Sequence, residues 1–148
     1  MNTKKLWMLA LLGMIVLSFV LISGYIHRED TTEPEKRTHV IENINAKETY
    51  TLIQNNKDNP NFVILDVRTP EEFANGHIEN AINLNYYSET FNNTLNKLDK
   101  NKTYLIYCRT GRRSGISLDI MNKLGFREVY NMLGGITQWQ AEGLPTTK

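Results

Sequence analysis

Two kinds of hydrophobic pattern alternate along residues 43–148. Short runs of consecutive apolar residues predict buried strands at residues 62–65, 81–84, 103–107 and 129–130. Apolar residues spaced three or four apart predict helices between these runs. The helices are expected at residues 45–55, after Thr69, over Phe91, Leu95 and Leu98, over Ile116, Ile120, Met121 and Leu124 as far as Gly125, and at residues 136–141 before Gly143. Alternating strands and helices, with strands apolar on both faces, predict an α/β domain with a parallel sheet.

Two of the predicted helices have clear start signals. Asn45 and Glu48 have the spacing of a capping box, in which each side chain bonds to the other residue's backbone N–H. Thr69 is followed by Pro70 and, at the third helical position, by Glu72. A helix is therefore expected to follow directly on the strand at residues 62–65.

The segment from residue 6 to residue 26 carries no charge and lacks a polar face. As a helix, these 21 residues would be about 31 Å long, which matches a bilayer core of roughly 30 Å. We therefore predict a single transmembrane anchor over residues 1–26. Lys4 and Lys5 on the short side favour a cytoplasmic N-terminus and a domain outside the cytoplasm. A cleaved signal peptide is the alternative, but Leu21 or Ile22 would then stand at the −3 position, where small residues are usual.

Residues 27–42 are rich in charge and threonine, carry Pro34 and have no apolar period, so they predict a flexible tether. The remainder, residues 43–148, has the size of one domain. The net charge of the chain is +1, which argues against nucleic-acid binding by phosphate neutralisation. One cysteine and three histidines exclude an intramolecular disulfide and a cysteine-rich zinc site, so no metal site is expected.

The candidate chemistry lies in one loop. Cys108 directly follows the predicted strand at residues 103–107, and the carboxyl ends of strands are where α/β sheets carry their sites. The loop consists of Arg109, Thr110, Gly111, Arg112 and Arg113 and leads into a helix. Its backbone N–H groups, its arginines and the helix N-terminus all favour a thiolate over a thiol. The loop is therefore expected to hold a nucleophilic sulfur in an anion-binding cup, and the alternative is a buried inert cysteine beneath a basic surface loop.

The Cys-x-x-Gly-x-Arg pattern of residues 108–113 resembles the active-site loop of rhodanese-like sulfurtransferases. Four further segments are similar to that family: Leu65 to Phe73, Gly76-His77-Ile78, Leu133 to Trp139, and Gly143-Leu144-Pro145. The resemblance implies a three-layer domain with a mostly parallel central sheet flanked by helices. Two positions depart from the pattern: Asn80 replaces a common glycine, and Asn85-Tyr86 stands where a proline often follows.

The resemblance implies sulfur transfer through a Cys108 persulfide, from thiosulfate or a similar small anionic donor to a thiol or cyanide. Arg109, Thr110, Gly111, Arg112 and Arg113 are expected to bind the donor, and Arg113 is alternatively expected to brace the loop. No cofactor is required, and the sequence does not specify an oligomeric state.

Asp66 and Arg68 fall at the same predicted sheet edge as Cys108 and are assigned a supporting role. That role is either on the substrate side or structural, with Arg68 paired to Glu71 or Glu72. His77 is expected to serve a turn rather than act as a base, and Trp139 to pack the last helix on the sheet.

Two other functions compete with sulfur transfer. A cysteine phosphatase or arsenate reductase needs an arginine six positions after the cysteine, where this chain has Ser114. A module that carries a persulfide or senses redox state without turnover would use the same loop, and only kinetics distinguish it from an enzyme.

Overall fold

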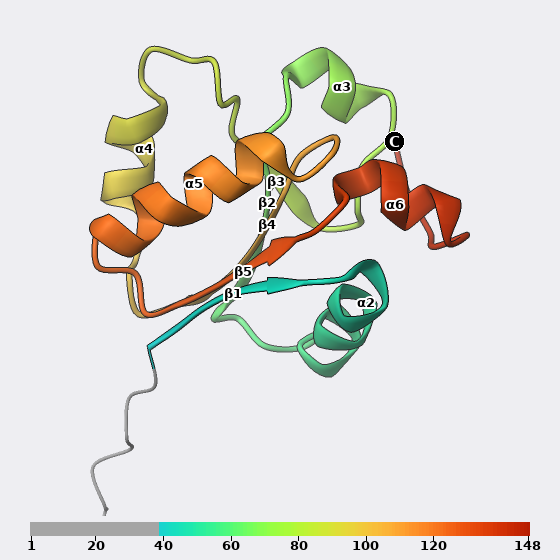
Figure 1. Cartoon of the computed structure of the whole chain (residues 1–148), viewed down its shortest axis with the longest axis horizontal. Helices are drawn as coiled ribbons and strands as arrows, with labels where there is room; N and C mark the ends of the chain where they lie inside the picture. Colours follow the sequence, from blue (N-terminus) through green and yellow to red (C-terminus); the bar gives the residue numbers. More distant parts are fainter. Residues whose placement is uncertain (1–38) are drawn as a thin grey trace, which may run out of the picture. The chain divides into compact units, whose positions relative to one another are not determined.

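The computed structural model describes residues 39–148, which form a five-stranded parallel sheet with helices on both faces (Figure 1). The strands are β1 (Val40–Ile44), β2 (Phe62–Asp66), β3 (Ala81–Asn83), β4 (Thr103–Tyr107) and β5 (Glu128–Met132). The helices are α2 (Ala46–Asn55), α3 (Pro70–Ala74), α4 (Phe91–Lys97), α5 (Arg112–Lys123) and α6 (Gly135–Ala141). The strand order is β1-β5-β4-β2-β3 and every neighbouring pair is parallel. The predicted parallel α/β architecture is confirmed.

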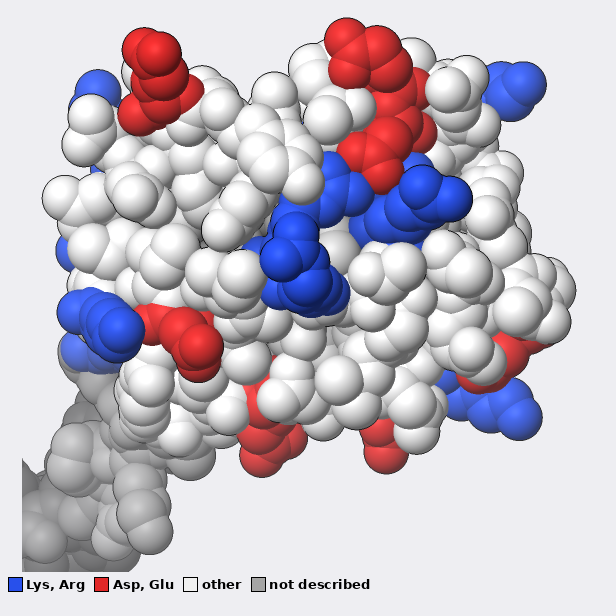
Figure 2. Space-filling model, turned by 45° about the horizontal axis from the view of Figure 1, so that its top comes forward, with Lys and Arg blue, Asp and Glu red and all other residues white. Residues whose placement is uncertain are grey.

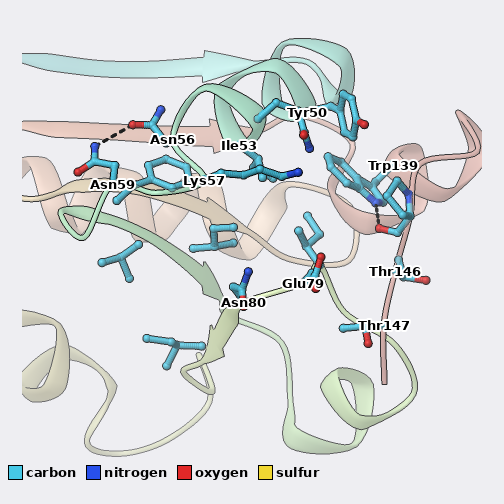
Figure 3. Close-up of a pocket in the computed structure, with 17 residues that line it drawn as sticks. Tyr50, Ile53, Asn56, Lys57, Asn59, Glu79, Asn80, Trp139, Thr146 and Thr147 are labelled. Atoms are coloured by element: carbon cyan, nitrogen blue, oxygen red, sulfur yellow. Dashed lines mark hydrogen bonds between the residues drawn. The ribbon is translucent and has the colours of Figure 1, made fainter.

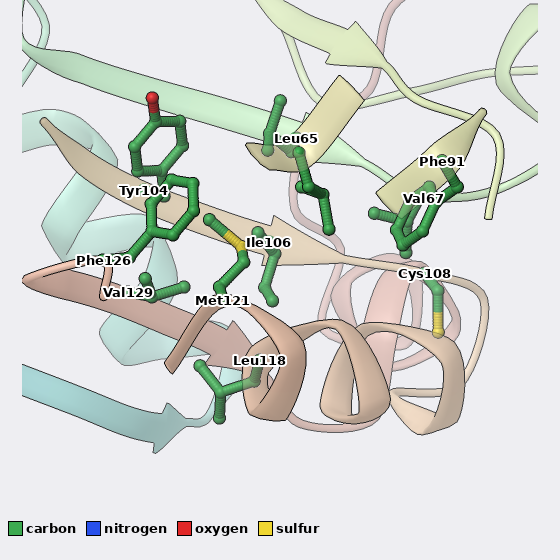
Figure 4. Packing of buried hydrophobic residues seen from close by; sticks show 11 residues of the cluster. Leu65, Val67, Phe91, Tyr104, Ile106, Cys108, Leu118, Met121, Phe126 and Val129 are labelled. Carbon is green, nitrogen blue, oxygen red and sulfur yellow. The ribbon is translucent and has the colours of Figure 1, made fainter. Parts of the chain in front are cut away.

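Alternate residues of each strand fill two separate cores. On one face, Leu65 and Ile106 pack with α4 and α5, and Cys108 belongs to this cluster (Figure 4). On the other face, Ile64 and Leu105 pack under α2 and α6 together with Trp139. The sheet is thus the middle one of three layers, as the resemblance implied.

Both predicted helix starts are present. Asn45 Oδ1 accepts the N–H of Glu48 at 3.0 Å, and the Glu48 carboxylate accepts the Asn45 N–H at 2.8 Å. Thr69 and Glu72 form the same reciprocal pair at the start of α3. The pair of Thr69 and Glu72 fixes α3 just beyond the carboxyl end of β2. Cys108 follows the carboxyl end of β4 and so lies at the same edge of the sheet.

The predicted tether over residues 27–42 is wrong at its end, because β1 begins at Val40 and pairs with β5. The domain accordingly begins before residue 43. The hydrophobic pattern does not predict β1, because this strand lies at the sheet edge and is only partly covered on each face. Ile41 packs against one core cluster and Ile44 against the other, with two exposed polar residues between them.

Both departures from the family pattern are accommodated locally. Asn80 adopts φ of 63°, a left-handed conformation that asparagine tolerates better than most residues with a side chain. The Tyr86 ring packs edge-on against Phe91, with centroids 5.3 Å apart, and so joins the core cluster under α4.

No helix within residues 39–148 is long and apolar enough to cross a membrane. The predicted anchor over residues 1–26 and the predicted tether up to residue 38 lie outside the described residues.

Candidate active site

The loop after β4 wraps its backbone around the Cys108 sulfur. Gly111 turns the chain with φ of 93°, and its N–H donates to Cys108 Sγ at 3.2 Å. A Cβ at Gly111 would lie 3.2 Å from the Gly134 nitrogen, so the close approach of these two loops favours glycine. The hydroxyl of Ser114, in the first turn of α5, lies 3.5 Å from the sulfur and 3.2 Å from the Gly111 carbonyl oxygen, and its one proton can be donated to either. The sulfur therefore lies at the start of a helix with several donors directed toward it.

Hydrogen bonding outweighs burial in setting the ionisation of this thiol. Cys108 is only 1% exposed, and burial by itself raises the pKa of a thiol. The Ser114 hydroxyl and the backbone N–H groups of Ser114, Thr110 and Gly111 stabilise the thiolate and together hold the pKa of Cys108 below its usual value. The predicted cup is thus made by backbone donors and one hydroxyl.

Arg113 braces the loop. Its two terminal nitrogens each donate to one carboxylate oxygen of Glu72 at 2.8 Å, and the Tyr87 ring lies 5.5 Å from its guanidinium carbon. The ion pair lowers the pKa of Glu72 to about 2. Since Glu72 also caps α3, this contact ties the active-site loop to α3. Of the two predicted roles for Arg113, the structure shows the bracing one.

Arg109, Thr110 and Arg112 are exposed around an open hollow of about 360 Å³, which Tyr87 and the Glu72–Arg113 pair complete. Figure 2 shows cationic residues gathered on this face of the molecule, with an acidic group beside them. Neither Arg109 nor Arg112 forms an ion pair within residues 39–148. These two cations are therefore available to an anion in the hollow.

Asp66 and Arg68 are both structural, but the predicted partner of Arg68 is wrong. Arg68 pairs with Asp66 through its Nε, 3.0 and 2.9 Å from the two carboxylate oxygens, and through a terminal nitrogen at 2.6 Å. That nitrogen also donates to the Gly76 carbonyl at 2.8 Å. The pair ties the end of β2 to the backbone at Gly76, and neither residue lines the hollow.

Trp139 packs in the core, as predicted, and His77, for which a turn role is predicted, stacks on a neighbouring ring. The His77 ring stacks on Phe73 at 3.7 Å, while its backbone pairs with Thr147. Trp139 is 1% exposed and donates through Nε1 to the Pro145 carbonyl at 2.8 Å. The segment containing His77 thereby holds the C-terminal residues in place.

Sequence reasoning missed three contributors to the site: Ser114 as a donor to the sulfur, Glu72 as the partner of Arg113, and the start of α6. The N–H groups of Ile136 and Thr137 donate to the carbonyls of Cys108 and Arg109, at 2.9 and 3.1 Å. Gly135 permits this approach, since a Cβ there would lie 2.4 Å from the Cys108 oxygen. No group of three His, Cys, Asp or Glu side chains in residues 39–148 could hold a metal ion.

Fold and site together define a three-layer α/β protein with a buried, hydrogen-bonded cysteine at the carboxyl edge of a parallel sheet. A family model described as "Rhodanese-like domain" matches residues 48–142. The chain belongs to the rhodanese-like domain family.

Several proteins share this domain. A sulfurtransferase of Allochromatium vinosum is 31% identical over 102 residues, which cover 69% of this chain and 94% of that protein. The thiosulfate sulfurtransferase GlpE of Coxiella burnetii is 37% identical over 84 residues, covering 53% of this chain and 72% of that protein.

A crystal structure of a rhodanese-related protein from Thermoplasma volcanium superposes with a TM-score of 0.61 at 31% identity, covering 72% of this chain and 97% of that one. A rhodanese-like domain protein from Staphylococcus aureus gives 0.57 at 31% identity, covering 72% and 99%. Those two chains consist of almost nothing else, so in those proteins this fold forms without an N-terminal extension.

Proposed function

We propose that this protein is a sulfurtransferase that moves a sulfane sulfur from thiosulfate, or a similar small anionic donor, to a thiophilic acceptor. The observation that carries the proposal is the Cys108 sulfur, which lies within hydrogen-bonding distance of the Gly111 N–H and the Ser114 hydroxyl. It belongs to a loop in which Arg109 and Arg112 form no ion pair within residues 39–148. Sulfurtransferase relatives with which the chain shares this domain support the same class of reaction.

The reaction consists of two displacements on sulfur. The Cys108 thiolate attacks the outer sulfur of thiosulfate, a cysteine S–S bond forms, and the electron pair of the breaking S–S bond leaves with sulfite. Cyanide or a thiolate then attacks the outer sulfur of the persulfide, giving thiocyanate or a new persulfide and regenerating the Cys108 thiolate. With anionic reactants throughout, neither step needs a general base, in accord with the packing role of His77.

The cup and the two exposed arginines have separate tasks in this scheme. The N–H groups and the Ser114 hydroxyl stabilise negative charge on the thiolate and, after the first step, on the persulfide. Arg109 and Arg112 attract the donor and hold its anionic end, so that its outer sulfur faces Cys108. Arg113 positions the loop through Glu72.

The test is a thiosulfate:cyanide assay on the full chain and on its Cys108→Ser variant. The wild-type protein should take up one extra sulfur atom from thiosulfate, detected by mass spectrometry, and the variant none. Arg109→Ala should raise the KM for thiosulfate several-fold, with Lys97→Ala as a control that removes an exposed cation from α4. Residual turnover of more than a few per cent in Cys108→Ser would place the chemistry elsewhere.

The same assay separates an enzyme from a persulfide carrier. Multiple equivalents of thiocyanate per protein are expected, whereas release of a single equivalent would identify a module that stores sulfur without turnover. A parallel assay with p-nitrophenyl phosphate should give no hydrolysis.

We further propose that the domain is held outside the cytoplasm by the apolar segment at residues 6–26. The length of that segment and the lysines before it support this arrangement. Protease added to intact cells or spheroplasts should then reach the domain, and protection until lysis would overturn the orientation.

A further inference from the structure

A second cavity, of about 430 Å³, lies apart from the active site on the sheet face that α2 and α6 cover. It arises because this helix layer is incomplete: α6 has only 7 residues, and the layer leaves part of β2 open. The volume is in the range of small-molecule pockets, roughly 300–1,000 Å³. None of the residues that line the hollow at Arg109 and Arg112 lines this cavity.

The floor of the cavity is apolar. Phe62 and Ile64 reach it from alternate positions of β2, and Ile78 adds a buried side chain beside them. Trp139 and Pro145 close one end, where the indole is hydrogen-bonded to the Pro145 carbonyl and therefore fixed in orientation. This floor favours a ligand whose body is apolar, while the rim of the cavity is polar.

One side of the cavity carries an unpaired cation. Tyr50, Ile53 and Gln54 have the spacing of one helix face on α2, and Lys57 follows at the next turn. Figure 3 shows Lys57 on this side, across the cavity from Glu79 and Asn80. Within residues 39–148, Lys57 forms no ion pair with Glu79 or with any other carboxylate. Its ammonium group is thus free to bind an anionic group of a ligand whose apolar part lies on the floor.

We propose that this cavity binds a small amphipathic carboxylic acid, with its hydrocarbon body on Phe62, Ile64 and Trp139 and its carboxylate on Lys57. The site is independent of the proposed sulfur transfer, since it shares no lining residue with the hollow at Arg109 and Arg112. The carboxylate of Glu79 on the opposite side confines an anionic group to the Lys57 side.

The test uses octanoate and its neutral counterpart 1-octanol, titrated calorimetrically at pH 7 into a fragment of residues 37–148. Trp139 is the only tryptophan in that fragment, so its fluorescence reports occupancy of this cavity directly. Octanoate should bind at micromolar to low-millimolar concentration, change the Trp139 emission, and bind more tightly than 1-octanol.

Charge variants then test the orientation. Lys57→Met should weaken octanoate binding about fivefold, the upper end for a solvent-accessible ion pair, and leave 1-octanol binding unchanged. Lys47→Met removes the same charge from an exposed position of α2 outside the cavity and should change neither. Glu79→Gln should act in the opposite direction and tighten octanoate binding. All three positions are exposed, so the fold and the thiosulfate activity should be retained.

Three results would overturn the proposal. One is no heat and no change in Trp139 emission up to 10 mM octanoate (about the highest useful concentration for a specific site). Another is equal affinity for octanoate and 1-octanol, and the third is an octanoate affinity that Lys57→Met leaves unchanged. Binding that persists in Cys108→Ser would separate this site from the sulfur-transfer site, whatever the outcome of the thiosulfate assay.

Discussion

Replacing Gly135 by alanine tests how the start of α6 holds the active-site loop. Gly135 has φ of 57°, and an added Cβ would lie 2.4 Å from the Cys108 carbonyl oxygen and 2.6 Å from the Arg109 carbonyl carbon. Those neighbours are backbone atoms, which cannot rotate away as a flexible side chain would. The loop and the helix must therefore separate.

The magnitude follows from two contributions. An alanine in the left-handed region costs about 1–2 kcal/mol relative to glycine. Separation of α6 from the loop also breaks the bonds from Ile136 to Cys108 and from Thr137 to Arg109, each worth about 1 kcal/mol. Gly135→Ala should therefore lower the free energy of unfolding by about 3–4 kcal/mol. A loop displaced by about 1 Å should also lower kcat/KM for thiosulfate by roughly 100-fold.

Gly143→Ala is the matched control. Gly143 has φ of 70°, but no atom lies within 4 Å of its added Cβ, so only the conformational contribution of about 1–2 kcal/mol applies. Urea denaturation of residues 37–148 measures both variants, and the thiosulfate assay gives the kinetic effect. Equal loss of stability in the two variants, with full activity in Gly135→Ala, would refute the claim that this close approach organises the loop.

Three further variants test other contacts. Glu72→Gln should lower the free energy of unfolding by roughly 2 kcal/mol at pH 7, because it weakens the pair with Arg113. Since the pKa of Glu72 is lowered to about 2, the stabilisation by this pair is complete above about pH 4.5 and is lost as the pH falls through 2. The stabilities of the wild type and the variant should therefore converge in acid denaturation. The pH dependence of iodoacetamide alkylation should show that Cys108 ionises with a midpoint below pH 8.5, which is about the value for a free thiol. Ser114→Ala should raise this midpoint, because it removes a donor to the thiolate. An unchanged midpoint would contradict the role of Ser114. Asn80→Gly should leave the free energy of unfolding unchanged or raise it slightly, whereas Asn80→Ala should lower it by about 1 kcal/mol. Thermal unfolding measures both variants, and equal Tm values for the two would contradict a left-handed conformation at Asn80.

The sequence predicted most helices and strands because each depends on local patterns. The reciprocal hydrogen bonds at Asn45 and Thr69 join residues three apart, and the strands β2 and β4 contain the continuous apolar runs 62–65 and 104–107. β1 was missed because an edge strand with partial cover on each face needs few apolar residues. Its place in the fold depends on pairing with β5, almost 90 residues further along the chain, which no local pattern contains.

The residues of the site divide in the same way. Cys108 and its loop are contiguous in sequence, so their resemblance to a family loop could be recognised. The partner of Arg113 could not, because Glu72 comes close only when β2 and β4 pair as neighbours. The partner of Arg68 was local after all, two residues back, but acidic residues on the following helix were an equally reasonable expectation.

The three arginines of the loop have different functions because they have different surroundings. Arg113 is 8% exposed, and its charge is neutralised by Glu72, so it contributes shape to the hollow rather than net charge. Arg109 and Arg112 remain charged and exposed, where dissolved salt screens them over a distance of about 10 Å at 0.1 M. The donors to Cys108 Sγ act at short range on a sulfur that is only 1% exposed, so salt screens their effect much less. Attraction of the anionic donor and ionisation of the sulfur therefore depend on separate groups. Added salt should weaken binding of the donor and leave the ionisation of Cys108 almost unchanged.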